Sequence, residues 1–585
     1  MGFISPNLPD LDREEWARGS RMERLRPMAQ DWAQAGFSAP EAVYVLYAAK
    51  IVLYCFGAAA LTALTPGIGS LGDIADWWTE PIFFQKVVVF TLLFEVLGLG
   101  CGFGPLTLRF LPPIGAFLHW LRPGTVRLPP WPSVVPLTRG THRSLLDVVL
   151  YAALLLAAVR LLLAPGQGSS EGGGVGVIDP LLFLPLFGLL ALVGLRDKTI
   201  FLAARTEVYG TLAVFFLFST TTDMIIGLKL MVVLIWWGAA TSKLNQHFPH
   251  VVSVMMSNNP LLRLKSFKRR FHRAYPDDIR PSRLSANLAH GGTVVEFVVP
   301  LVLLLSDGGP VTAVAAIVMV CFHLQILTSL PMGVPLEWNV FMIFAIAFLF
   351  VENAAVGLGD LGNPLVLLVI AAAAAVVVLG NLFPHQFSFL PAMRYYAGNW
   401  ATSLWCFTPS AVAKLDASVT KSARLPAAQL ETLYGEETAA LLVHKGYAFR
   451  AMHTHGRALF GLIPRACGPD HETDYQPHDG EFVAGATLGW NFGDGHLHHE
   501  QLLAALQERC AWEPGEVRLI ALESQRFWDP RQEYRLVDAA TGELERGVVL
   551  VSDMLERQPW AGEIPVHDVV TTPARRPAPI LTPEV

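Results

Sequence analysis

The stretch that decides the fold class is LVLLVIAAAAAVVVLGNL, residues 365–382, which holds no charged side chain. A helix that crosses a bilayer needs roughly 20 predominantly apolar residues, so this stretch is typical of a transmembrane helix. The rest of the chain agrees, because 52% of its 585 residues are hydrophobic and only 16% are charged, against about 25% charged in a typical soluble protein. The sequence therefore predicts an integral membrane protein and excludes a soluble, disordered or collagen-like one.

Ten apolar runs of this kind follow one another along the chain. They are Ala42–Leu64, Ile82–Phe103, Leu145–Leu163, Leu181–Gly194, Val208–Phe218, Met224–Ala240, Leu288–Leu305, Val311–Leu327, Val340–Val351 and Leu365–Leu382. The runs that begin at Val208 and Val340 are short for a complete crossing. We therefore expect a mainly α fold, a polytopic helical membrane bundle of eight to ten spans, with ten as the best estimate.

The charges of the connecting loops support ten crossings. The loops 104–143 and 244–286 are strongly basic, whereas 165–179 and 352–363 hold acidic residues and no basic ones. With ten spans, every strongly basic loop falls on the same side as the N-terminus. Because basic loops stay in the cytoplasm, we expect a cell-membrane protein with both termini cytoplasmic.

The pattern changes beyond Pro384, and the predicted domains follow from that change. They are a cytoplasmic N-terminal segment (1–41), a transmembrane helical domain (42–384), an interfacial connector (385–430), a small soluble α+β domain (431–570) and a disordered tail (571–585). Strand-like composition marks Phe449–Ile463, Phe482–Asn491, Glu516–Glu523 and Tyr534–Asp538. The turn at 540–543 predicts a hairpin with Val548–Val551, and Glu500–Glu508 is a helix candidate.

Ionisable residues inside the apolar runs are the main functional signal, because a charge in lipid is costly and usually faces a bundle interior or a wet cavity. Lys50, Lys86 and Arg160 lie near the ends of their runs and are expected to snorkel to the interface. Glu95, Glu296 and His323 lie deeper and have shorter side chains. We therefore expect these three inside the bundle.

Spacing places further candidates on common helix faces. Lys229, Trp236 and Lys243 recur every seven residues, which is about two helical turns, so they share one face. On the following run, His290 and Glu296 belong to a polar stripe with a spacing of three. A lysine in such an apolar setting has a lowered pKa and can act as a base. The alternative is a set of interhelical ion pairs and hydrogen bonds that hold the bundle together.

Four strings carry a resemblance to a known superfamily. TSKL (241–244), LAHGGTVVEFVVPLVLLL (288–305), FHLQILTSL (322–330) and EWNVFMIFAIAFLF (337–350) resemble the core of the horizontally transferred transmembrane (HTTM) superfamily, which includes vitamin K-dependent gamma-glutamyl carboxylase. The similarity covers about residues 206–350. It implies that Lys243 is a base that activates a reduced quinone, and that His290 and His323 match the superfamily's His-Gly-Gly and Phe-His histidines.

The chain as a whole also resembles a family of actinobacterial transmembrane proteins of unknown function. The strings that carry this similarity are GWNFGDGHLHHEQLLAAL (489–506) and YRLVDAATGELERG (534–547). This second resemblance implies a membrane location and no particular reaction.

The C-terminal domain holds a dense group of histidines. Asp494, His496, His498 and His499 follow one another closely, and His453 and His455 lie two apart on a strand candidate, where they would share a face. Neutral imidazoles are common zinc ligands, so His496, His498, His453 and His455 are the metal-binding candidates. The alternative is the exposed first turn of a capped helix. Because no CxxC or HExxH motif accompanies them, zinc is not expected.

Taken together, these patterns favour a membrane-embedded enzyme acting on a lipid or quinone-like substrate. Lys243 or His290 would act as base, with Glu296 and His323 relaying protons and with Lys229 and Trp236 contacting a cofactor. The alternatives are a transporter or lipid translocase, and a membrane scaffold or assembly protein with a cytoplasmic interaction domain. The expected partners are membrane lipids and a small lipophilic substrate, and the net charge of −6 argues against nucleic acid.

Overall fold

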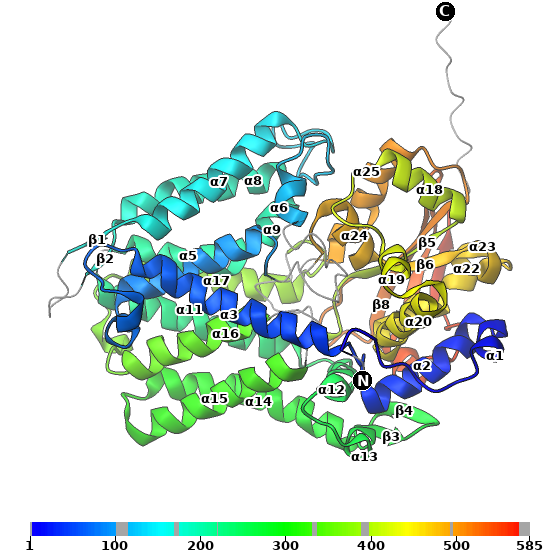
Figure 1. Ribbon diagram of the computed structural model, residues 1–585, viewed down its shortest axis with the longest axis horizontal. Coiled ribbons are helices and arrows are strands. Elements are labelled where there is room, and N and C mark those ends of the chain that lie inside the picture. The colour runs from blue at the N-terminus through cyan, green and yellow to red at the C-terminus, as the bar shows by residue number, and fades with distance from the viewer. Residues whose placement is uncertain are drawn as a thin grey trace, which may run out of the picture.

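A bundle of helices forms one end of the molecule and a sheet covered by helices forms the other (Figure 1). The computed structural model describes residues 3–100, 115–168, 175–218, 220–329, 336–387, 397–491 and 495–572. The expected disordered tail lies almost entirely outside the described residues, since the last strand ends at Thr571.

Six helices of the described chain are long and apolar enough to cross a membrane, judged by length and composition. They are α3 (Glu41–Ala63), α7 (Leu145–Leu163), α11 (Thr221–Ser242), α14 (Arg283–Leu305), α15 (Gly309–Ser329) and α17 (Leu365–Leu382). The structure therefore confirms a mainly helical membrane protein, and two of these helices, α7 and α17, have the bounds that the sequence predicted.

The other four apolar runs are also helical but shorter. They form α5 (Pro81–Val96), η2 (Pro180–Phe183) continuing into α8 (Leu184–Arg196), the segment η3 (Thr206–Gly210), α10 (Thr211–Val214) and η4 (Phe215–Leu217), and α16 (Leu336–Ala345) continuing into η5 (Ile346–Glu352). Six helices of the described chain, not the expected ten, thus have the length of a full crossing.

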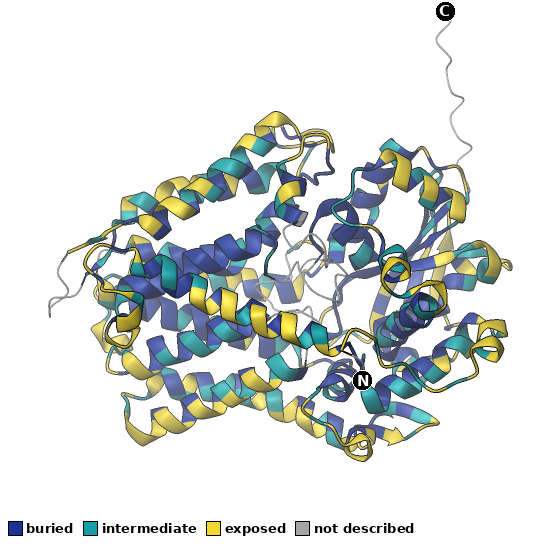
Figure 2. Ribbon diagram, in the orientation of Figure 1, coloured by how far each residue is buried: buried dark blue, intermediate teal, exposed yellow. Residues whose placement is uncertain are grey.

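Helix α5 lies in the middle of the bundle. Every one of its residues from Ile82 to Val96 is buried, although the helix includes Gln85, Lys86 and Glu95. Five of the six long helices bury one face and expose apolar side chains on the other (Figure 2), whereas α11 is mostly buried. This pattern is the one expected when the outer face contacts lipid.

Consecutive helices run in opposite directions between the two ends of the bundle. α3 begins at the end next to the sheet and reaches the opposite end (Figure 1), and it packs on α5, which packs on α7, which packs on α8. Farther along the chain, α14 packs on α15, which packs on α16. The N-terminal helix α2 (Arg21–Ala35), which follows α1 (Arg13–Arg18), packs on α20 (Glu436–Met452) of the C-terminal domain.

The C-terminal domain contains a six-stranded antiparallel sheet with strand order β10-β9-β8-β7-β5-β6. Its strands are β5 (Thr402–Phe407), β6 (Gln476–Asp479), β7 (Val517–Leu522), β8 (Arg531–Asp538), β9 (Gly542–Leu550) and β10 (His567–Thr571). The predicted hairpin is confirmed, because Asp538 pairs with Gly542 across the β8–β9 turn. The expected connector 385–430 supplies β5, a strand in the interior of this sheet.

Helices pack around the sheet, and they include two segments that the sequence predicted to be strands. The helices are α18 (Pro409–Ser418), α19 (Pro426–Tyr434), α20, α21 (Thr454–Gly461), α22 (Ile463–Cys467), α23 (His471–Asp474), α24 (Gly480–Leu488), α25 (Glu500–Cys510) and α26 (Val551–Glu556). The strand predictions at Phe449–Ile463 and Phe482–Asn491 are wrong. Both segments are buried helices, so their apolar, aromatic composition reflects burial and not strand geometry.

Short elements connect the helices at the two ends of the bundle. At the sheet-side end lie α6 (Gly115–Trp120), α9 (Lys198–Ala203), α12 (Phe248–Asn258), α13 (Lys265–Arg269), β3 (His272–Ala274) and β4 (Asp278–Pro281). At the opposite end lie η1 (Leu71–Asp73), α4 (Ile74–Trp77), β1 (Gly166–Gln167), β2 (Val177–Ile178) and η6 (Leu358–Asp360).

Candidate functional site

Lys243 and Glu296 form a direct ion pair between α11 and α14. Lys243 directly follows the last residue of α11. Its Nζ lies 2.6 Å from Oε1 and 2.5 Å from Oε2 of Glu296. The rings of Phe248 and Phe322 lie 5.6 and 5.8 Å from the same Nζ. The structure thus brings together two of the predicted site residues in an apolar setting.

His323 is fixed by hydrogen bonds to two other helices. Its Nε2 accepts from the indole N–H of Trp236 at 3.0 Å, and its Nδ1 lies 2.9 Å from Oδ1 of Asn339. Since the amide oxygen can only accept, the ring is the neutral tautomer with its proton on Nδ1. Trp236, predicted as a cofactor contact, therefore uses its only donor to join α11 to α15.

Two other predicted site residues lie away from this group. His290 is exposed on α14, and it is separated from Glu296 by six residues, about 9 Å along the helix axis. Lys229 lies about 21 Å before Lys243 on α11, and its Nζ donates to the carbonyl oxygens of Asn353 at 2.8 Å and Val356 at 2.7 Å. The structure does not gather the predicted residues around one shared centre.

Lys50 and Lys86 do not snorkel to the interface, contrary to expectation. Lys86 is fully buried, and its Nζ donates to Oγ1 of Thr65 and to the carbonyl oxygens of Leu162 and Ala164 at 2.5–2.9 Å. Lys50 points into the bundle as well. Protein carbonyls and carboxylates stabilise these ammonium groups in place of water. The position of a lysine near the end of an apolar run does not reveal such partners.

A second polar group, which we call the interior polar site, lies between α3, α5, the segment that begins at Arg205, and α16. Ion pairs and electrostatic contacts join its members, which are Lys50, Tyr54, Glu95, Arg205, Glu207, Tyr209 and Glu337. Nζ of Lys50 lies 3.1 Å from Oε2 of Glu337 and donates to the carbonyl oxygen of Gly100 at 2.7 Å. Two cations and three carboxylates are thus held inside an apolar bundle, where each is costly unless it is paired or functional.

Tyr209 lies at the centre of this interior polar site. Its ring contacts Trp338 and Phe341, with centroids 6.0 and 5.3 Å apart. It lies within electrostatic range of Glu95 and Glu337, and its hydroxyl is buried with no hydrogen-bond partner among the described residues. A buried hydroxyl without a partner costs free energy, so it marks a position where a bound molecule can supply the partner.

The backbone next to Tyr209 is irregular. Arg205 has φ 50° and ψ 42°, a left-handed conformation that is rare for a side chain other than glycine, asparagine or aspartate. It precedes a π-helical turn at Thr206–Gly210, and a second π-helical segment, Ile346–Glu352, continues α16. Both features are enriched at functional sites because the surrounding fold must hold them in place. The guanidinium lies 3.3 Å from Oε1 of Glu207 and 5.3 Å from the ring of Trp338.

The C-terminal histidines divide into two groups. His496 and His499 come together with Glu523, and one ligand atom from each lies within 4.8 Å of the others. His498 turns the other way, and its Nδ1 lies 2.7 Å from Oγ of Ser403. His499 therefore takes the place predicted for His498. Asp494, which belonged to the predicted cluster, lies outside the described residues.

His453 and His455 form the other group, at the junction of α20 and α21 and not on a strand. Their rings stack 5.4 Å apart. The ring N–H of His453 donates to the carbonyl oxygen of Phe449 at 2.8 Å, and burial lowers its pKa to about 3. His455 accepts from the guanidinium of Arg450 at 3.0 Å. Within the described residues, neither ring belongs to a group that can share a metal ion.

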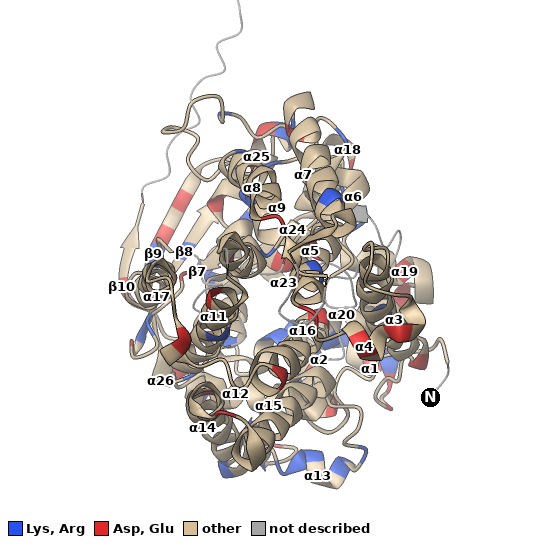
Figure 3. Cartoon of the chain, turned by 90° about the vertical axis from the view of Figure 1, so that its left-hand side faces the viewer, with Lys and Arg blue, Asp and Glu red and all other residues tan. Residues whose placement is uncertain are grey.

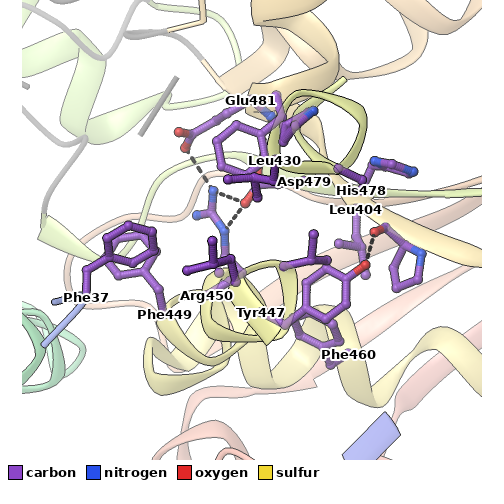
Figure 4. Close-up of a pocket in the computed structure, with 17 residues that line it drawn as sticks. Phe37, Leu404, Leu430, Tyr447, Phe449, Arg450, Phe460, His478, Asp479 and Glu481 are labelled. Atoms are coloured by element: carbon purple, nitrogen blue, oxygen red, sulfur yellow. Dashed lines mark hydrogen bonds and ion pairs between the residues drawn. The ribbon is translucent and has the colours of Figure 1, made fainter. Parts of the chain in front are cut away.

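Arg450 also lines a small pocket of about 60 Å³ in the C-terminal domain (Figure 4). Its guanidinium is paired with Asp479 and, at 3.1 Å, with Glu481. The hydroxyl of Tyr447 donates to the carbonyl oxygen of Pro477 at 2.6 Å. The pocket is too small for a lipid, and its charged groups are already paired.

The fold defines the class of protein as a polytopic helical membrane protein with a C-terminal sheet domain. A family model described as a transmembrane protein of unknown function (DUF3556) matches residues 1–569, and the chain belongs to this family. Comparisons with curated proteins and with solved structures give no match. Family membership supports the membrane assignment, while the HTTM resemblance stays a prediction.

Proposed function

We propose that this protein is a membrane-embedded enzyme acting on a lipid-soluble substrate, such as a quinone, whose polar end binds at the interior polar site. The observation that carries the proposal is the buried hydroxyl of Tyr209, which has no partner among the described residues and lies near the charged side chains of Glu95, Arg205 and Glu337. A second oxygen without a hydrogen-bond partner in the described parts of the chain, Oε2 of Glu207, lies in the same segment. A ligand with a hydroxyl or carbonyl group would satisfy these atoms, while its apolar part stays in the lipid phase.

A purely structural role explains these features less well. Ion pairs that only join helices would leave few buried polar atoms unsatisfied, as the three carbonyl and hydroxyl contacts of Lys86 illustrate. The left-handed Arg205 adds a strained residue directly beside the unpartnered oxygens. Strain and unsatisfied polar atoms both cost stability, and a bound substrate gives a reason for keeping them.

Lys243 and Glu296 are proposed as proton carriers and not as a free base. The amine and the carboxylate lie 2.5 Å apart, which is close enough for a proton to pass between them. Lys243→Ala tests this role. If Lys243 takes part in the reaction, the lipids of membranes that contain the variant should differ from those of membranes that contain the wild type. An unchanged lipid composition would assign the pair to helix packing alone.

We further propose that the chain crosses the membrane ten times, with the sheet on the cytoplasmic side. Figure 3 views the bundle from the end away from the sheet. The connections at that end contain no lysine or arginine in the sequence, and their acidic residues include Asp73, Asp76, Glu80, Asp179, Asp307 and Asp360. The loop 244–286 at the sheet-side end contains eight basic residues. Basic loops stay in the cytoplasm, and the alternating directions of ten helical runs return the chain to the sheet side.

Native mass spectrometry of the full chain extracted from its own membrane tests the proposed function. We expect one lipid-soluble molecule per wild-type chain, and its loss in Glu207→Gln. The matched control is Glu545→Gln, since Glu545 is also a buried carboxylate paired with an arginine, Arg465, but lies in the sheet. Equal retention in all three proteins, or no bound molecule in the wild type, would contradict the proposal. Movement of the bound lipid between leaflets would favour the transporter alternative.

A further inference from the structure

A group of metal-ligand side chains lies where the last membrane helix joins the C-terminal sheet. His496 and His499 lie on the segment leading into α25, and Glu523 directly follows β7. One ligand atom of each lies within 4.8 Å of the other two, and Nε2 of His496 directly contacts Oε1 of Glu523. Ligand atoms around a tetrahedral zinc ion are about 3.3 Å apart, because each lies about 2.0–2.1 Å from the metal. Small side-chain rotations would bring the three to that spacing.

His499 is oriented as a ligand by the sheet. Its Nε2–H donates to the carbonyl oxygen of Thr402 at 3.1 Å, which leaves the lone pair on Nδ1. That nitrogen is buried and has no hydrogen-bond partner among the described residues, and the whole residue is 2% exposed. A backbone carbonyl that fixes one ring nitrogen so that the other can bind metal is the usual arrangement around ligating histidines.

Charged and polar neighbours hold Glu523 in place. Its Oε2 lies 3.4 Å from the guanidinium of Arg535, which also pairs with Glu500 at 2.7 Å. His385, in the segment after α17, places its Nδ1 3.5 Å from Oε1 of Glu523 and is half-exposed. A fourth donor therefore lies next to the three residues already named.

His385 also lines an open cleft of about 340 Å³. The cleft borders the contacts that tie α17 to the sheet, because Arg526 donates to the carbonyl oxygen of Leu382 at 2.9 Å and Ser524 donates to that of Pro384 at 3.1 Å. Solvent and small molecules can thus approach the group through this cleft.

We infer that His496, His499 and Glu523 bind one divalent transition-metal ion, with His385 as the fourth ligand. Imidazole nitrogens with one carboxylate oxygen are a zinc donor set, and two histidines with one carboxylate also suit Fe²⁺. We assign zinc, since three histidines and one glutamate complete a tetrahedron. The site does not depend on the interior polar site, which lies in the bundle.

The test uses the full chain in detergent, stripped with a chelator and titrated with Zn²⁺ by calorimetry. We expect one ion per wild-type chain and at least a tenfold loss of affinity in Glu523→Gln and in His499→Gln. The matched control is His478→Gln, because His478 is also buried in this domain with one ring nitrogen unpartnered. Equal affinity in all four proteins means an adventitious ion only and overturns the inference, as does the absence of binding to the wild type.

A second measurement needs no variant and so does not depend on the variants folding. Co²⁺ added to the stripped wild type should give the intense visible absorption of a tetrahedral site, and one equivalent of Zn²⁺ should remove it. Fe²⁺ that binds more tightly than Zn²⁺ would overturn the assignment of zinc. A Co²⁺ spectrum no different from that of the free aqueous ion would overturn the site itself.

Discussion

Nζ of Lys50 and Oε2 of Glu337 lie 3.1 Å apart between α3 and α16, with side chains only 5% and 1% exposed. The two residues are separated by almost half of the chain, so the pair fixes how the first membrane helix meets α16. Removing one partner of a buried pair leaves an uncompensated charge, whereas removing both leaves none. The same two residues also provide much of the charge in the interior polar site.

We predict that Lys50→Met lowers the free energy of unfolding by about 3–5 kcal/mol, because it removes the ammonium group that pairs with the buried carboxylate of Glu337. The double variant Lys50→Met with Glu337→Leu should recover most of that loss. Denaturant unfolding in detergent measures both. The exposed pair of Arg531 and Asp568 is the control, since its removal should cost less than about 1 kcal/mol. A double variant as unstable as the single one would contradict the pairing.

Trp236→Phe should destabilise the bundle by about 1–3 kcal/mol, since it leaves Nε2 of His323 buried without a donor. Trp237→Phe is the matched control. The indole of Trp237 donates to the carbonyl oxygen of Phe297 at 3.0 Å but is 38% exposed, and that carbonyl lies within helix α14, so its loss should cost less. Thermal unfolding compares the two, and equal effects would argue against His323 as a helix-linking residue.

Stability should fall in acid because of buried histidines outside the membrane. Burial lowers the pKa of His247 to about 4. The hydrogen bond that its Nε2–H donates to Oε1 of Gln525 raises the pKa and so offsets part of this effect. The unfolded chain takes up this proton near pH 6.5 and the folded chain only near pH 4, so stability is lost as the pH falls between those values. By pH 5 the loss from this residue is about 2 kcal/mol. His247→Gln should show a shallower dependence on pH, and an unchanged slope would contradict burial of a neutral ring.

Accessibility of single cysteines tests the orientation. In a variant without the six native cysteines, Ser70→Cys should react with a membrane-impermeant maleimide in intact cells. Arg263→Cys should react only after lysis, because its loop lies on the sheet side. The reverse result would place the sheet outside the cytoplasm.

The apolar runs of this sequence predict its helices closely, and the reason is physical. In lipid every backbone amide must be paired within its own helix, so an uninterrupted run such as Leu365–Leu382 has one available structure. In the C-terminal domain the same composition is ambiguous. Phe482–Asn491 and Glu516–Glu523 both look strand-like, yet the first segment is mainly helix α24 and the second contains β7, since long-range packing decides between them.

The candidate site was only partly predictable, because partners come from distant parts of the chain. Spacing along α11 indicated that Lys243 and Trp236 share a face, and the structure gives each a partner on another helix. Nothing local indicated that Glu337 would meet Lys50, or that Glu523 would join His496. Ionisable residues inside apolar runs, Lys50 and Glu95, were the available signal for the interior polar site, but they did not indicate which side chains they would meet.

The most direct measurement compares Tyr209→Phe with wild type for two quantities, the bound lipid per chain and the melting temperature after delipidation. Because the hydroxyl of Tyr209 has no partner within the described protein, we predict that its removal leaves the delipidated melting temperature unchanged or higher while most of the bound lipid is lost. Tyr151→Phe should do the opposite, since that hydroxyl donates to the carbonyl oxygen of Val96 at 2.9 Å. Full retention of lipid by Tyr209→Phe would contradict substrate binding at the interior polar site.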